Sequence, residues 1–206
     1  MAKTLESIDE RLAEFIGKQK IFFTASAAAD GRVNVSPKDG ASLRVLNERT
    51  VAYLDQTGSG NETAAHVSAS ARLTLMFCAF EGAPMILRLY GAAKVLARRT
   101  AEYTELLRST FGGAEPPGAR QMIVLQVDRV QTSCGYGVPL FEYVGERETL
   151  RRWAMSKGES GLKEYRRQKN VASIDGFPTG LVETDDAEEA VGNIPAEVES
   201  GTKMEL

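Results

Sequence analysis

Apolar residues are grouped along the chain into short runs, and the spacing within those runs predicts a mainly β protein with helices at both ends. In residues 5–17 the apolar side chains recur every three or four positions, as they do on one face of an amphipathic helix. Elsewhere the runs are short and partly alternating, which is typical of strands. Strands are therefore expected at 20–27, 32–37, 42–46, 50–55, 72–80, 85–97 and 120–134, and further helices from about Asn61, at 100–111 and at 146–170.

Glycine and proline interrupt this pattern at defined points. Asp30-Gly31 favours a tight hairpin between the first two strands, and Pro37, which has no N–H for a sheet ladder, is expected to end the second. Gly91 lies in the middle of an apolar run and indicates a bulge or a close approach of two backbones. The run at 72–80 is apolar at nearly every position, so we expect it to be buried on both faces.

The order of these elements predicts an α+β fold class that is mainly β: a small antiparallel barrel, closed or partly closed, with flanking helices. Strands follow strands through short turns, which a sheet of βαβ units does not do. We expect one domain over 1–180, in which Gly158 and Gly161 divide the helical segment 146–170. Residues 181–206 are expected to form a disordered acidic tail, because Glu183 to Leu206 holds eight acidic residues and one lysine.

Composition and charge are those of an ordinary soluble globular protein, with 43% apolar and 26% charged residues. The net charge of −3 gives no reason to expect nucleic acid or an anionic membrane as a partner. The N-terminus does not resemble a signal peptide and no apolar run approaches the ~20 residues of a membrane helix, so a cytoplasmic location is expected. Cys78 and Cys134 lie far apart, and we expect two free, largely buried thiols in a reducing compartment.

The first candidate for chemistry is a glycine-rich loop between a strand and a helix, Thr57-Gly58-Ser59-Gly60-Asn61-Glu62-Thr63. Glycines let backbone N–H groups turn toward a ligand, and the first turn of a helix adds free donors and a positive dipole end, which together favour a phosphate. The hydroxyls of Thr57, Ser59 and Thr63 would add donors. The loop also has an interpretation without a ligand, because Ser59 and Glu62 have the spacing of a capping box.

A second set of polar residues lies on the return strand of the hairpin. Alternation places Asn34, Ser36 and Lys38 on one face, where they either converge on a ligand or face solvent at a sheet edge. Lys38 and Arg88 are the best cations for a phosphate or for the electron-rich edge of a flavin. Arg88 serves equally well as a surface or ion-pair residue.

His66 is the only histidine, which excludes a histidine-rich metal site and disfavours a catalytic triad. A structural or surface role is the more common one for such a residue. We predict no metal site, and the sequence identifies no catalytic residue. Near Cys134, glycines on both sides of Tyr136 mark a turn that either presses an aromatic ring against a ligand or partner subunit or is a packed loop.

Taken in order, these segments resemble one known family. The stretches VNVSPK, TVAYLDQTGSGNETAAH, RLTLMFCAF-EGAP-MILRLYG and VQTSCGYGVP are similar to those of the pyridoxamine 5'-phosphate oxidase-like FMN-binding proteins. The similarity extends roughly from Ile8 to Pro178. It implies a six-stranded antiparallel split β-barrel that forms a homodimer and holds FMN at the subunit interface.

The resemblance also implies where the cofactor lies. Asn34, Ser36 and Lys38 would face the flavin ring or ribityl chain. The loop at the phosphate end would supply Thr57, Gly58, Ser59, Gly60, Asn61 and Thr63. Arg88, and the Cys134–Tyr136 turn of the partner subunit, would close the site.

The function implied is that of an FMN-dependent oxidoreductase acting on a small molecule. The vitamin B6 oxidases carry a late Arg-x-His pair for the substrate phosphate, and no histidine follows His66 here, so that particular activity is not expected. One alternative is a reductase of the same fold that uses the deazaflavin F420, whose poly-glutamate tail needs a basic groove that the sequence does not show. Others are a non-catalytic protein that stores or senses flavin, and a structural dimer with an empty pocket.

Overall fold

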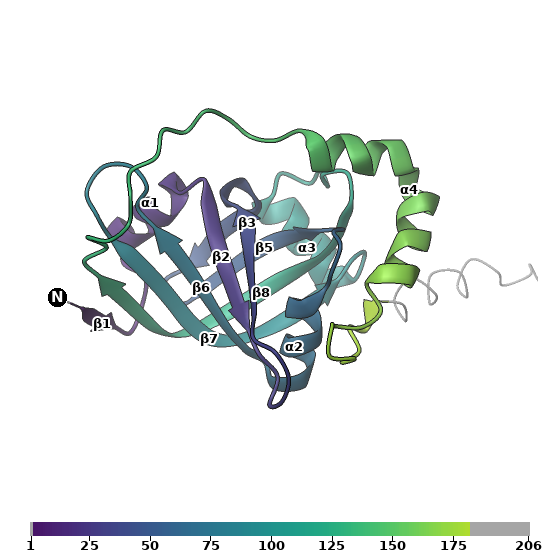
Figure 1. Cartoon of the computed structure of the whole chain (residues 1–206), viewed down its shortest axis with the longest axis horizontal. Coiled ribbons are helices and arrows are strands. Elements are labelled where there is room, and N and C mark those ends of the chain that lie inside the picture. The colour runs from purple at the N-terminus through teal and green to yellow at the C-terminus, as the bar shows by residue number, and fades with distance from the viewer. Residues whose placement is uncertain (1, 182–206) are drawn as a thin grey trace, which may run out of the picture.

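The structure, a computed structural model, describes residues 2–181 (Figure 1). Residue 1 and residues 182–206 lie outside the described residues, so the predicted acidic tail, apart from Leu181, falls outside them as well. Within residues 2–181, no helix is both long enough and apolar enough to cross a membrane.

One curled antiparallel sheet of eight strands forms the body of the molecule. The strands are β1 (Lys3–Leu5), β2 (Ile21–Ser26), β3 (Asn34–Asp39), β4 (Leu43–Asn47), β5 (Thr50–Gln56), β6 (Arg72–Cys78), β7 (Ile86–Ala97) and β8 (Ala119–Ser133). Seven follow the order β3-β2-β6-β7-β8-β5-β4, and β1 pairs with β8. With β3 and β4 as its two edges, the sheet curls without closing. This is the predicted split barrel, with more strands than the six expected.

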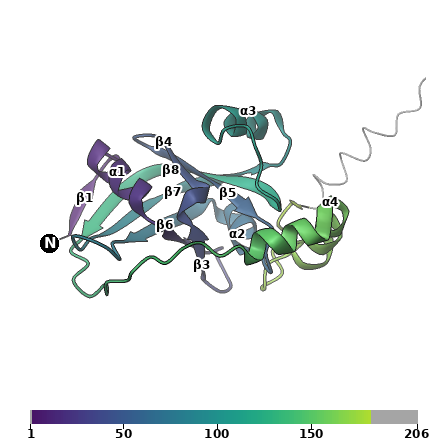
Figure 2. The same cartoon turned by 90° about the horizontal axis from the view of Figure 1, so that it is seen from above.

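Helices flank the sheet at its ends and on one side. They are α1 (Glu10–Lys18), α2 (Glu62–Ser70), α3 (Ala101–Thr110) and α4 (Thr149–Lys169), with a 3-10 turn at Gly40–Ser42. In Figure 1, α1 and α2 lie near opposite ends of the sheet. Figure 2 shows α3 standing on one side of the sheet and α4 lying beyond its end.

Two hydrophobic cores lie on opposite faces of the sheet. The larger one, between α1 and the face here called inner, includes Leu12, Ile16, Phe22, Tyr53 and Leu75. The smaller one, on the outer face under α3, consists of Leu54, Leu96, Tyr103, Leu107 and Met122. Leu54 follows Tyr53 in β5, and the alternation of a strand puts consecutive side chains on opposite faces.

Three predictions about element boundaries and burial are wrong, each for a visible reason. The first helix begins at Glu10 rather than near residue 5, because Lys3–Leu5 pairs with β8 and Asp9 caps the helix by accepting the N–H of Leu12 at 2.7 Å. β3 continues through Pro37, which an edge strand tolerates. β6 alternates between buried and half-buried positions over most of its length instead of being buried on both faces.

The predictions for two glycines are confirmed. The register of β7 and β8 shifts between Tyr90 and Gly91, and a Cβ on Gly91 would lie 1.9 Å from the carbonyl oxygen of Gln126, so a bulge and a close backbone approach coincide. Gly158 has φ 63° and ψ 177° and divides α4 at that point, whereas Gly161 stays within the helix.

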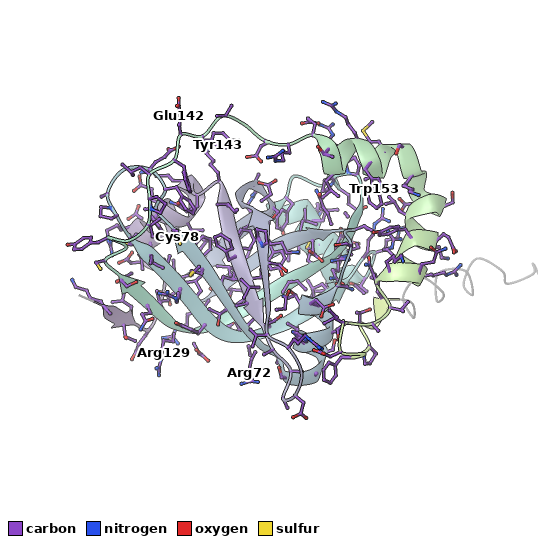
Figure 3. The ribbon with its side chains drawn as sticks, viewed as in Figure 1. Arg72, Cys78, Arg129, Glu142, Tyr143 and Trp153 are labelled. Carbon is purple, nitrogen blue, oxygen red and sulfur yellow. The ribbon has the colours of Figure 1, made fainter. Side chains whose placement is uncertain are left out.

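Both cysteines are free, but only one is buried. Cys78 is enclosed at the end of β6 (Figure 3), as expected. Cys134 is exposed because β8 ends at Ser133 and the chain leaves the sheet there, so the prediction of a buried thiol is wrong for Cys134.

Candidate functional site

The polar centre of the molecule is the carboxylate of Asp55, which is 3% exposed near the end of β5. One oxygen accepts from Lys38 Nζ at 2.6 Å, and the other accepts from Arg120 Nε and Gln121 Nε2, both at 2.8 Å. Burial alone would raise the pKa of Asp55, but the charges of Arg120 and Lys38 outweigh burial and hold this pKa well below its usual range. Two cations face one carboxylate, which leaves an excess of positive charge for an anion nearby.

Sheet register explains why these side chains meet. Lys38 is paired with Phe22 of the inner core, and Asp55 is two residues after Tyr53 of the same core, so both side chains are on the inner face. β3 and β5 are not neighbours in the sheet. The Lys38–Asp55 ion pair therefore joins two strands that no backbone ladder connects.

A row of smaller polar groups continues along β3. Asn34 Nδ2 lies 3.2 Å from Ser26 Oγ and 3.3 Å from Thr63 Oγ1, and the Ser36 hydroxyl donates to Asn34 Oδ1 at 2.8 Å. The buried imidazole of His66 has its Nδ1 3.1 Å from the same Ser26 hydroxyl. The structure thus brings Asn34, Ser36 and Thr63 together, and His66 holds a buried structural position behind them.

The glycine-rich loop lies on the other side of Asp55. Gln121 Nε2 donates to Asn61 Oδ1 at 2.8 Å, so the network reaches the residue just before α2. Asn61 is 2% exposed, its side chain does not cap the helix, and its Nδ2 has no hydrogen-bond partner among the described residues. The first N–H groups of a helix also have no partner within it. A buried amide donor beside such groups fits an anionic ligand.

Gly58 and Gly60 leave open space beside this loop. A Cβ on Gly58 would meet no atom within 4 Å, and one on Gly60 would meet only the Glu62 side chain, at 3.7 Å. Neither glycine is among the residues with positive φ. The packing and backbone of the chain therefore do not require glycine at these positions, as expected if a ligand approaches the backbone closely. Because of this open space, the loop fits the phosphate end of a nucleotide.

The capping-box interpretation of the loop is wrong. α2 begins at Glu62 itself, and Ser59 is exposed outside the helix. The Glu62 carboxylate accepts the N–H of Ile174 at 3.0 and 3.2 Å, and the Thr57 hydroxyl donates to the carbonyl oxygen of Gly118 at 3.0 Å. Both side chains therefore fasten the loop to neighbouring segments.

Of the remaining predicted contacts, Arg88 lies on the opposite face of the sheet, and Cys134 and Tyr136 lie beyond the end of β8. Arg88 is in register with Met76, and Met76 with Phe23, which alternates with the inner Phe22. Arg88 is therefore on the outer face, where its Nη1 lies 3.4 Å from Ser133 Oγ. We call Arg88, Cys134 and Tyr136 the outer set, and we call Asn34, Ser36, Lys38 and residues 57–63 the loop set.

Residues 57–63 and Arg88 also lie toward opposite ends of β8, whereas Lys38 follows Pro37, which is in register with Arg88 through Phe23 and Met76. The strand starts beside the glycine loop, where Ala119 pairs with Gln56, and it ends just before Cys134. Its 15 residues span roughly 45 Å when straight. Tyr136 is 82% exposed beyond that end. Within one chain, the structure does not bring the outer set to the loop set.

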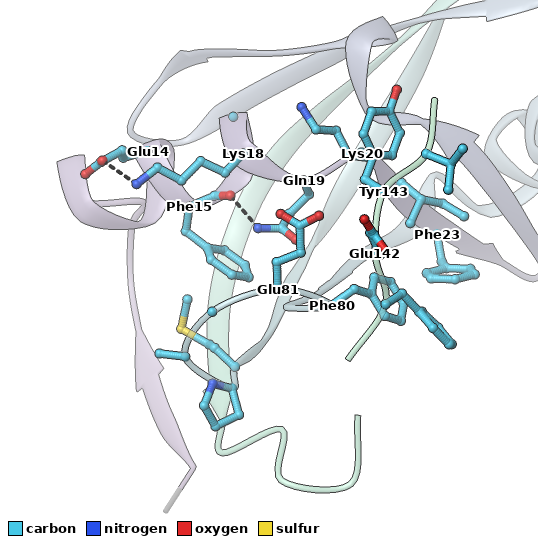
Figure 4. Close-up of a pocket in the computed structure, with 18 of the residues that line it drawn as sticks. Glu14, Phe15, Lys18, Gln19, Lys20, Phe23, Phe80, Glu81, Glu142 and Tyr143 are labelled. Atoms are coloured by element: carbon cyan, nitrogen blue, oxygen red, sulfur yellow. Dashed lines mark hydrogen bonds and ion pairs between the residues drawn. The ribbon is translucent and has the colours of Figure 1, made fainter. Parts of the chain in front are cut away.

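A groove of about 1380 Å³ lies between the end of α1, the β6–β7 turn and the extended segment 141–145 (Figure 4). Figure 3 shows Glu142 and Tyr143 on this segment as it crosses above the sheet. Its aromatic lining consists of Phe15, Phe23, Phe80, Phe141 and Tyr143. Its charged side chains are three basic and three acidic ones: Arg11, Lys18, Lys20, Glu14, Glu81 and Glu142. The groove is thus aromatic with balanced charge.

Sequence comparison decides the family. The profile of the pyridoxamine 5'-phosphate oxidase family matches residues 8–134, which is more than half of the chain. This chain belongs to that family. The pyridoxamine 5'-phosphate oxidase family protein ustO of Aspergillus flavus is 36% identical over 191 residues, which cover 84% of this chain and 76% of that protein. The resemblance seen in the sequence is confirmed, and the curled sheet agrees with the split-barrel fold.

The solved structures have lower sequence identity to this chain than ustO has. HupZ of Group A Streptococcus is 18% identical, with a TM-score of 0.47 over 60% of this chain and 91% of that one. The FAD binding protein of Mycobacterium smegmatis is 14% identical, with a TM-score of 0.42 over 63% and 97%. At these values no ligand or activity follows for this chain.

Sequence reasoning missed the residues that join the site together: Asp55, Arg120, Gln121 and Asn170. Asp55 and Arg120 could have been predicted as site residues. Each lies at the end of an apolar run, and a charge that is buried there needs a partner. Asn170 carries no such signal. Its partners Arg120 and Gly58 are 50 and 112 residues away in sequence.

Proposed function

We propose that this family member binds FMN between two subunits and acts as an oxidoreductase on a small molecule. One observation carries the proposal: the β3 residues of the loop set and Arg88 lie on opposite faces of one sheet, and residues 57–63 lie toward the other end of β8 from Arg88. A two-fold axis would bring the outer set of one copy to the loop set of the other, as a site shared in a symmetric dimer requires. Membership in the family supports a flavin as the ligand.

The phosphate end of FMN is proposed to lie on the glycine loop. The open space beside Gly58 and Gly60 admits a ligand close to the backbone. The amide of Asn61 and the first turn of α2 offer donors there. Lys38 and Arg120 leave an excess of positive charge around Asp55, which would stabilise a phosphate held near it.

The remainder of the flavin is proposed to follow β3. Asn34 and Ser36 present amide and hydroxyl groups along that strand, and Arg88 of the second subunit would bring a positive charge to the electron-rich edge of the ring. When bound, FMN supplies hydride or electron transfer, while the protein holds and orients it and limits the access of water.

The outer face supports a second copy as the partner. Phe23 and Met76 are half-buried there beside Arg88, in register across three strands, whereas the α3 core lies elsewhere on that face. Apolar side chains on an otherwise solvated sheet face favour a covering surface. A two-fold interface that uses this face twice would cover the patch in both copies.

The aromatic groove is proposed to receive the small-molecule substrate. Its three basic and three acidic side chains give no concentration of positive charge for a phosphate ester. Glu14 and Lys18, which line it, are paired with each other at 2.6 Å. An aromatic or apolar substrate without a phosphate is therefore the class that we propose.

The test is reconstitution with FMN, followed by flavin fluorescence and by sedimentation. We expect micromolar or tighter binding by a dimer. Lys38→Ala should weaken it by about tenfold or more through loss of a charge-assisted contact, and Gly58→Val should weaken it by a similar factor by filling the open space beside the loop. Gly17→Val is the matched control, because a Cβ at Gly17 also meets nothing within 4 Å but lies on α1, away from the loop.

A monomer that does not bind FMN at micromolar concentration would contradict the proposal, as would unchanged affinity in both loop variants. The absorbance spectrum of the purified protein separates a flavin from the deazaflavin F420. Tight FMN binding without reduction by NADH or NADPH would favour a storage or sensing role over catalysis.

A further inference from the structure

The end of α4 is tied to the glycine loop by one buried side chain. Asn170, the C-cap of α4, is 0% exposed. Its Oδ1 accepts from Arg120 Nη1 at 2.8 Å, and its Nδ2 donates to the carbonyl oxygen of Gly58 at 3.0 Å. The side chain thus uses both of its ends, one on the Asp55 network and one on the backbone of the proposed phosphate loop.

These contacts hold the loop from both of its ends. Arg120 binds Asp55, Asp55 binds Gln121, and Gln121 binds Asn61 at the start of α2. Asn170 supplies the matching contact at Gly58. A Cβ on Gly58 would meet no atom, so packing does not fix Gly58 itself, and the bond from Asn170 holds its carbonyl next to the Thr57–Gly118 contact.

The segment that follows Asn170 is anchored independently of this bond. Thr179 Oγ1 donates to the carbonyl oxygen of Asn170 at 2.6 Å, and Asp175 forms an ion pair with Arg32 of the β2–β3 hairpin. The ring of Phe177 lies edge-on to His66, with 6.3 Å between the ring centroids. Removing the Asn170 side chain therefore leaves the segment other contacts that hold it in place.

We propose that Asn170 is a positioning residue for the glycine loop. It fixes the Gly58 carbonyl on one side, so that the amides on the other side of the loop keep the orientation in which they bind an anion. Residue 170 lies beyond the 8–134 match to the family, so this contact comes from the C-terminal part of the chain. Its effect on FMN rests on the proposed function, whereas its effect on the loop does not.

Two substitutions at this position separate loop positioning from general stability. Asn170→Ala removes both contacts. Asn170→Asp keeps an acceptor for Arg120 but loses the donor to Gly58, and it adds a negative charge beside Arg120, so its effect on the loop is judged from hydrogen exchange without ligand. Thr179→Ala is the control, because it weakens the same C-terminal segment without touching Gly58 or Arg120.

The experiment measures hydrogen exchange of residues 57–63 in the full chain without ligand, and then the affinity for FMN. We expect these amides to exchange about tenfold faster in both Asn170 variants and at the wild-type rate in Thr179→Ala. FMN affinity should fall by about tenfold in Asn170→Ala, which adds no charge beside the site, and should stay at the wild-type value in Thr179→Ala.

Wild-type exchange of the loop in Asn170→Asp would overturn the assignment, and so would equal acceleration in Thr179→Ala. If the wild type does not bind FMN, the proposed function fails by itself, and the exchange data still decide whether Asn170 positions the loop.

Discussion

At the residue scale, the buried carboxylate of Asp55 holds two cations and the amide of Gln121, so its charge stabilises the whole polar centre. Arg120 is only 3% exposed and would lose the partner that compensates its charge. We expect Asp55→Asn to lower the free energy of unfolding by about 3–5 kcal/mol at pH 7. Urea denaturation of the two proteins measures the difference. A loss below 1 kcal/mol, which is the range of surface pairs, would show that the charge is not essential.

The same residue predicts a pH dependence with a definite sign. The folded-state pKa of Asp55 lies below its ordinary value of 3.8, because the charges of Arg120 and Lys38 outweigh the effect of burial. The stabilisation is therefore complete above about pH 4 and declines as the pH falls below that value, by about 1.4 kcal/mol for each pH unit. The difference between wild type and Asp55→Asn should shrink between pH 4 and pH 3 in urea titrations. A constant difference would mean that Asp55 is not the titrating group.

At the scale of elements, the β7–β8 pair depends on a glycine. A Cβ on Gly91 would lie 1.9 Å from the Gln126 carbonyl oxygen and 2.9 Å from its carbon, so neighbouring backbone must move. We expect Gly91→Ala to lower the free energy of unfolding by about 1–3 kcal/mol or more, as overpacking does. Gly17→Ala on α1, where the Cβ meets nothing, should be neutral or stabilising by up to about 1 kcal/mol. Similar values for the two variants in thermal or urea unfolding would contradict this account of the bulge.

Most elements were predictable because their signals are local. Alternation located the strands from β2 onward, and Gly91 marked the bulge, because both depend on neighbouring residues. β1 was missed, since its three residues become a strand only by pairing with Lys3 opposite Thr132, far along the chain. The inward row of Asn34, Ser36 and Lys38 followed from alternation, but its partners across the open barrel did not.

The least predictable part of the site is the link between elements that are distant in sequence. Asp55 meets Gln121 because the two pair across β5 and β8, and a register shift after Asp55 leaves Arg120 unpaired in the ladder beside them. Asn170 reaches Gly58 from a helix that no local pattern directs toward the loop. Such contacts depend on the curl of the sheet as a whole, which short-range spacing does not encode.

At the scale of the whole molecule, one chain holds two incomplete halves of the proposed site. The β3 residues of the loop set face the inner side of the sheet and Arg88 faces the other side, with Cys134 and Tyr136 beyond the end of β8. The curl of the sheet does not bring them together, and we propose that a symmetric dimer does. The central claim is therefore that each FMN site draws on both subunits, with residues of opposite sheet faces.

Mixed dimers test this claim most directly. Gly58→Val impairs the loop set and Arg88→Glu impairs the outer set, and each variant alone should be a dimer that binds little FMN at a concentration that saturates the wild type. After subunit exchange at equal concentrations, about half of the dimers contain one chain of each kind, and each of these has one intact site, so about a quarter of the wild-type FMN stoichiometry should return. Recovery of that fraction, measured by flavin fluorescence on dimers counted by native mass spectrometry, is the predicted result. Mixed dimers that form but bind no FMN would contradict a shared site.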